Sequence, residues 1–156
     1  MCIVVDTCAF SSVFITTDKD HLDFKPIYDW LMNGDGKLVY GGKTYFKELE
    51  TAHKFLKILT QLQRMGKTIK LPDKEIDDYE KKVKRKVNKK DFDDPHILSI
   101  LAISNCKLVC TKDKRSMPYL KNLSLYPKKF IKPKIYSKKC NLNILCDDNI
   151  ASICIK

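Results

Sequence analysis

The chain has 156 residues, of which 44% are hydrophobic and 31% charged, and this suits one compact domain with a sizeable core. These figures exclude a disordered chain and a membrane protein, because no apolar stretch approaches the length that spans a bilayer. The formal net charge of +11 favours a polyanionic partner such as nucleic acid, with a solubilising lysine-rich surface as the alternative and an anionic membrane surface as a weaker third.

Apolar periodicity predicts alternating strands and helices along the chain. The first part predicts, in order, a buried strand over 2–5, a helix over 7–15, a polar loop over 18–23, and a helix over 24–32 that the glycine-rich 33–36 ends. The middle predicts, in order, a strand over 37–40, a helical segment over 44–64 that can break near 51–54, a short strand over 68–71, and a helix that Pro72 and Asp73 open.

The last third continues this alternation. It predicts, in order, a tight acidic loop over 91–94, a buried helix from Pro95 through Ser104, a strand over 107–110, a short helix over 117–120 and an edge strand over 134–136. Such alternation favours a mainly parallel sheet sandwiched by helices, an α/β fold whose site lies beyond the carboxyl ends of the strands.

One helical stretch, 79–90, contains seven Lys/Arg residues and a single acid. A solvated helix face and an arm that binds a phosphate backbone explain this composition equally well.

The seven cysteines have an odd count and irregular spacing, which does not predict a disulfide framework. Four of them lie in apolar stretches, where cysteine behaves as a small buried hydrophobe: Cys2, Cys106, Cys110 and Cys154. A zinc site from Cys140, Cys146 and Cys154 has poor spacing and too few ligands. Reduced thiols in a cytoplasmic protein are therefore expected, and the N-terminus carries no signal-peptide pattern.

Acidic residues are placed where the chemistry of such a fold is expected. Asp6 and Asp113 follow predicted strands, Asp94 begins a buried helix, and Glu48 lies on the helix after the second strand. Carboxylates that converge repel one another by roughly 4 kcal/mol per pair at about 4 Å and an effective dielectric near 20, so a compensating cation is expected. Hard oxygen ligands around an open site suit Mg²⁺ or Mn²⁺.

Each acid also has a purely structural explanation. Asp6 and Asp94 are suitable helix N-caps, Asp113 can cap a short helix or form a turn, and Glu48 can be an ordinary exposed helix acid. These explanations weaken when the acids are taken together, because all of them point to the same edge of the sheet.

Four segments, in this order, resemble a PIN-domain nuclease. They are Cys-Ile-Val-Val-Asp6, the stretch from Gly41 to Leu49 that holds Glu48, the stretch from Asp93 to Leu98, and Leu-Val-Cys-Thr-Lys-Asp113. The resemblance covers about 1–137, with 134–136 similar to a late strand of some members, and 138–156 is expected to be a C-terminal extension packed on the same domain.

The resemblance implies a three-layer α/β/α sandwich and cleavage of RNA with Mg²⁺ or Mn²⁺. It implies that Asp6, Asp94 and Asp113 bind metal and that Glu48 completes the site, with Glu50 and Asp93 as the alternatives to Glu48 and Asp94. Residues expected to orient these ligands are Thr111, Asp93 and His96, where a general-base role for His96 is the alternative. Residues expected to contact RNA phosphates are Lys43, Lys112, Lys114 and Arg115.

Such a ribonuclease would suit a toxin held by a protein inhibitor or a phage-defence effector, with RNA as its substrate, no membrane partner, and a partner subunit or a homo-oligomer also conceivable. The alternative is an RNA-binding module that keeps the fold without cleaving. A phosphotransfer receiver or a haloacid-dehalogenase-like domain fits less well, because the latter wants a second acid at the position of Cys8.

Overall fold

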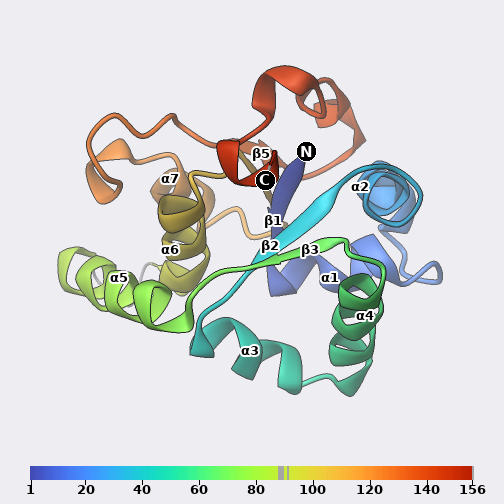
Figure 1. The fold of residues 1–156 in the computed structure, drawn as a ribbon, viewed down its shortest axis with the longest axis horizontal. Helices are drawn as coiled ribbons and strands as arrows, with labels where there is room; N and C mark the ends of the chain where they lie inside the picture. Colours follow the sequence, from blue (N-terminus) through green and yellow to red (C-terminus); the bar gives the residue numbers. More distant parts are fainter. Residues whose placement is uncertain (88–89, 91, 156) are drawn as a thin grey trace.

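The computed structural model of the chain describes residues 1–87, 90 and 92–155 (Figure 1). Its centre is a five-stranded sheet in the order β3-β2-β1-β4-β5, and every pair of neighbouring strands is parallel. The strands are β1 (Cys2–Val5), β2 (Lys37–Tyr40), β3 (Thr68–Lys70), β4 (Leu108–Cys110) and β5 (Lys134–Tyr136). The predicted α/β class and parallel sheet are thus confirmed, with β5 as the expected edge strand.

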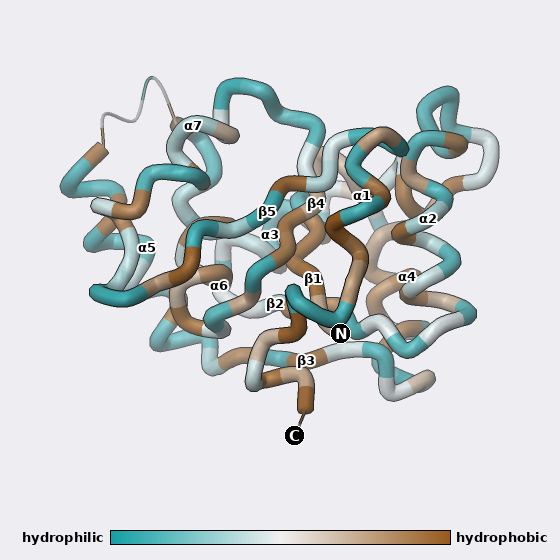
Figure 2. The backbone as a smooth tube through the Cα atoms, turned by 90° about the horizontal axis from the view of Figure 1, so that it is seen from above, coloured by the Kyte–Doolittle hydropathy of each residue, from teal (hydrophilic) through white to brown (hydrophobic). Residues whose placement is uncertain are grey.

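Helices cover both faces of this sheet, which makes the predicted three-layer α/β/α sandwich. The helices are α1 (Thr7–Phe14), α2 (His21–Met32), α3 (Lys43–Glu50), α4 (His53–Arg64), α5 (Asp73–Lys86), α6 (Pro95–Ser104) and α7 (Met117–Leu120). In both views α5, α6 and α7 lie on one side of the sheet and α1, α2 and α4 on the other, while α3 lies across the carboxyl ends of the strands (Figures 1 and 2).

The strands form because each is a short run of apolar residues, many of them β-branched, that both helical layers can cover. Figure 2 shows these strands in brown at the centre of the molecule. All four residues of β1 have no solvent exposure, and α6 is buried almost all round, from Pro95 to Ala102. The sheet and α6 therefore form the rigid part of the molecule from which the site residues project.

Two local expectations are corrected. The polar segment 18–23 is not only a loop, because α2 already begins at His21, whose Nδ1 lies 3.0 Å from the carbonyl oxygen of Ser12. The segment 44–64 is two helices, which separate at Thr51 and Ala52. Asp91 of the predicted acidic loop and residues 88–89 of the basic stretch lie outside the described residues.

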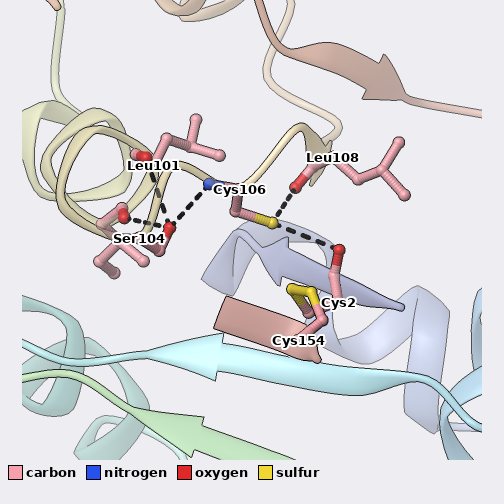
Figure 3. The surroundings of a disulfide bond; sticks show 7 residues. Cys2, Leu101, Ser104, Cys106, Leu108 and Cys154 are labelled. Atoms are coloured by element: carbon pink, nitrogen blue, oxygen red, sulfur yellow. Dashed lines mark hydrogen bonds between the residues drawn. A yellow bond between two sulfur atoms is a disulfide. The ribbon is translucent and has the colours of Figure 1, made fainter. Parts of the chain in front are cut away.

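The end of the chain packs against its beginning. Residues Lys139–Ile144 form a 3-10 segment that packs on β5 and α2, and two further short turns lead to Cys154. Cys154 forms a disulfide with Cys2, at a Cα–Cα distance of 5.8 Å, beside the thiol of Cys106 (Figure 3). The expectation of reduced thiols is therefore wrong for this pair, because the fold brings together two apolar segments from opposite ends of the sequence.

Within residues 1–87, 90 and 92–155, no helix combines the length and the hydrophobicity that crossing a bilayer requires.

The disulfide closes a loop with a sequence separation of 152 residues, so it should restrict the unfolded chain strongly. We expect Cys154→Ser to lower the free energy of unfolding by about 2–4 kcal/mol in urea denaturation. Cys140→Ser is the matched control, because Cys140 is an exposed free thiol, and it should leave stability unchanged. Equal stability of both variants, with two extra free thiols found in the unreduced wild-type protein, would contradict the disulfide.

Candidate metal centre

The candidate site lies where the strand order changes direction. The chain runs from β1 outward to β2 and β3 on one side, then returns to β4 and β5 on the other side of β1. The crevice between the carboxyl ends of β1 and β4 is therefore the topological switch point, where open α/β sheets bind their ligands. Asp6 follows β1 and Thr111 follows β4, and the backbone N–H of Asp6 donates to the Cys110 carbonyl at 2.9 Å.

Asp6 is held from three directions. Its carboxylate is almost fully buried and accepts hydrogen bonds from Thr111 Oγ1 at 2.6 Å, from the backbone N–H of Cys8 at 3.2 Å and from Cys8 Sγ at 3.1 Å. Burial and the charge of Asp6 raise the pKa of the Cys8 thiol to about 12, so the thiol keeps its proton and acts as a donor. Asp6 thus caps α1, as its structural explanation requires, but it also accepts bonds from outside that helix.

The helix α3 brings Glu48 to the same place. It starts directly after Gly42, whose φ of 85° favours glycine and where a Cβ atom would approach Ile76 Cγ2 to 2.5 Å. The Tyr45 hydroxyl of α3 donates to the Val5 carbonyl at 2.7 Å, which fixes the helix against the end of β1. Glu48 Oε2 then accepts a hydrogen bond of 2.6 Å from Thr7 Oγ1.

His96 approaches the same oxygen from the buried side. Its Nε2 lies 3.2 Å from Glu48 Oε2, yet the ring is fully buried and neither ring nitrogen makes a well-aligned hydrogen bond among the described residues. Burial alone would raise the pKa of Glu48, but contact with His96 and with Thr7 outweighs it and lowers that pKa. Glu50, the alternative acid, is exposed, so Glu48 is the one that faces the crevice.

Asp94 stands at the start of α6 but does not cap it through its side chain, which makes no capping hydrogen bond. Partial burial, together with the charges of Asp6, Asp113 and Glu48, raises the pKa of Asp94 to about 7, although His96 acts in the opposite direction. The alternative acid Asp93 instead points outward, with its side chain 61% exposed and 3.4 Å from Arg115. The four predicted acids therefore share one electrostatic field at the switch point.

Asp113 is oriented by its own loop. Its backbone N–H donates to Thr111 Oγ1 at 3.0 Å, so this one hydroxyl connects Asp113 with Asp6. Its carboxylate accepts from the backbone N–H of Arg115 at 2.8 Å and faces the Arg115 guanidinium at 3.4 Å. Within the described residues, no group of three or more His, Cys, Asp and Glu side chains is drawn together as a formed metal-binding set.

The residues predicted to contact RNA have different surroundings. Lys112 Nζ donates to Ser12 Oγ at 2.9 Å and pairs with Asp20, and Arg115 pairs with Asp113 and Asp93, so both are engaged within the protein. Lys43 and Lys114 are exposed, and neither side chain makes an ion pair in the described part of the chain. These two are the most available of the predicted cations.

Sequence reasoning missed three residues that position the acids: Thr7, Cys8 and Tyr45. The first two follow Asp6 directly, and hydroxyl and thiol groups in the first turn of a helix after a strand-end acid were a readable signal. Tyr45 gave no such signal, because its partner is a backbone carbonyl of β1, 40 positions away.

The sequence matches no protein-family model, and searches of the curated proteins and of the solved structures give no match. The acids and their hydrogen bonds are therefore the basis for any statement about function.

The raised pKa of Asp94 makes stability depend on pH. An acid whose folded pKa of about 7 lies above its unfolded value of 3.8 leaves the folded state unpenalised below about pH 4 and costs it increasing stability as the pH rises to about 7. In EDTA at about pH 8, we expect Asp94→Asn to be more stable than wild type by on the order of 2 kcal/mol after allowing for solvent screening.

This gain should disappear at about pH 4, as followed by thermal unfolding at each pH. The matched control is Asp93→Asn, which removes a neighbouring but outward-facing carboxylate and should give no comparable gain. A stabilisation of equal size for the two variants, or one that does not change with pH, would contradict a shared field at Asp94.

Proposed function

We propose that this protein is a PIN-like, metal-dependent endoribonuclease. The observation that carries the proposal is the state of Asp94, a carboxylate without a capping hydrogen bond, whose pKa is raised by burial and by three other acids at the switch point of the sheet. Such repulsion costs stability, so it is best explained by a cation that the acids exist to bind.

The donor set suits the proposed ion in kind. Asp6, Asp94 and Asp113 are the proposed ligands of Mg²⁺ or Mn²⁺, both of which prefer carboxylate oxygens. When bound, the cation would act as a Lewis acid that lowers the pKa of water and stabilises the leaving oxygen of a phosphodiester. Glu48, held by Thr7 and adjacent to His96, would complete the site or orient the attacking water.

Two further residues are proposed to act through these ligands. Thr111 donates to Asp6 and accepts from the backbone of Asp113, and so it would fix the direction of both. His96 is proposed to position Glu48 from the buried side, since no exposed part of its ring is available to a substrate. Asp93 would act at the rim by holding Arg115.

RNA is the proposed substrate, because a net charge of +11 attracts a polyanion and the acids need a substrate that tolerates metal-assisted hydrolysis. In-line attack by water would leave 3′-hydroxyl and 5′-phosphate ends. A cytoplasmic role as a toxin or phage-defence effector, with an acidic protein inhibitor or a partner subunit and no membrane partner, and with a homo-oligomer conceivable, is proposed with it.

The test is cleavage of a fluorescent single-stranded RNA with Mg²⁺, with Mn²⁺ or with EDTA. Wild type should cleave only with a divalent cation, and Asp6→Asn and Glu48→Gln should each reduce the rate by more than about 100-fold, the upper end for residues that merely orient ligands. The matched control is Glu50→Gln, because Glu50 lies two positions from Glu48 on the same helix but is exposed.

Thermal unfolding supplies a second readout. Mg²⁺ or Mn²⁺ should raise the melting temperature of wild type and of Glu50→Gln, and it should have no such effect on Asp6→Asn. Cleavage that persists in EDTA or in Asp6→Asn would rule out the proposed mechanism. RNA binding without cleavage under every metal would instead favour the RNA-binding module.

A further inference from the structure

A groove of about 700 Å³ opens beside the acidic cluster. It lies at the carboxyl ends of β4 and β5, one strand further along the sheet than the crevice between β1 and β4. One wall is the loop after β4, because Lys112 and Lys114 line the groove and flank Asp113 in the sequence. The groove and the acidic cluster thus share the Asp113 loop.

The walls of the groove offer several kinds of contact. Met117 of α7 and the edge of the largely buried Phe24 of α2 supply apolar surface. Lys138, just after β5, faces the groove from the side opposite the Asp113 loop in chain order, and Asp23 supplies an exposed carboxylate. A volume of this size accommodates a small molecule or one unit of a polymer, since ligand sites usually measure about 300–1,000 Å³.

The cations in the groove divide into one that is engaged and two that are available. Lys112 pairs with Asp20 and Ser12, and its Nζ lies 6.0 Å from the centre of the Phe24 ring, so it forms part of the wall. Lys114 and Lys138 are exposed, and neither forms an ion pair among the residues that the structure describes. Two uncompensated lysines in one groove favour an anionic ligand.

We propose that this groove binds the nucleotide next to the scissile phosphate of a single-stranded RNA, an inference that rests on the proposed function. Lys114 and Lys138 would contact its phosphates, and Met117 would pack against its sugar or base, as in other single-strand grooves that combine cations with apolar surface. Asp23 would accept a hydrogen bond from the ribose 2′-hydroxyl, the group that distinguishes RNA from DNA.

The test measures binding without cleavage. A fluorescein-labelled pentaribonucleotide and its deoxyribose counterpart are titrated in EDTA, and fluorescence anisotropy reports affinity. Wild type should bind the ribose form more tightly, and Lys138→Glu should weaken that binding by about tenfold at moderate salt. The matched control is Lys57→Glu, an equal charge change on the exposed face of α4, which should weaken binding less than about twofold.

Asp23→Ala supplies the specificity readout. It should bring the ratio of ribose to deoxyribose affinity close to one, whatever it does to either affinity alone. Equal losses for Lys138→Glu and Lys57→Glu, or a ratio that Asp23→Ala leaves unchanged, would overturn the proposal.

Failure of this inference is distinguishable from failure of the proposed function. If the protein cleaves no RNA but Lys138→Glu alone loses binding in EDTA, the groove is supported and the nuclease proposal fails. If the protein cleaves RNA with a metal, and Lys138→Glu and Asp23→Ala keep the wild-type kcat/KM, the groove proposal fails and the nuclease proposal stands.

Discussion

The hydrogen bond of 2.6 Å from Thr111 to Asp6 joins the carboxyl ends of two adjacent parallel strands, and the geometry of the site depends on it. Both groups are almost fully buried, so a carboxylate without this donor would lose its hydration and gain little in return. The same hydroxyl accepts from the backbone of Asp113, which extends the constraint to a second acid. One side chain therefore orients two acids that the sequence separates by more than a hundred positions.

The other two acids reach this point on helices that are held from the sheet side. Tyr45 fixes α3 to the end of β1, and the fully buried α6 carries His96 against Glu48. Because these helices are rigid, Asp94 cannot move away from its neighbours without disturbing the core, and the repulsion remains in the structure as a raised pKa. Groups that only served to cap helices would not need this arrangement.

Most of the fold was readable from the sequence because its signals are local. Apolar runs gave all five strands, and the change from strand to helix at Asp6 and at Asp94 gave the places where acids converge. What failed depends on contacts distant in sequence: α2 starts early because His21 meets Ser12, and the Cys2–Cys154 disulfide joins the two ends of the chain. The partners of the cations were not readable for the same reason.

The two ends of the sheet have separate tasks. The disulfide and the C-terminal segment lie at the amino ends of the strands, away from the acids, so they can stabilise the domain without restricting the crevice (Figure 1). At the carboxyl ends, a cluster of carboxylates would repel a phosphate backbone despite the positive charge of the whole chain. A substrate can approach only if cations adjoin the acids, and Lys114 and Lys138 lie in the neighbouring groove, where attraction next to the acids would offset that repulsion.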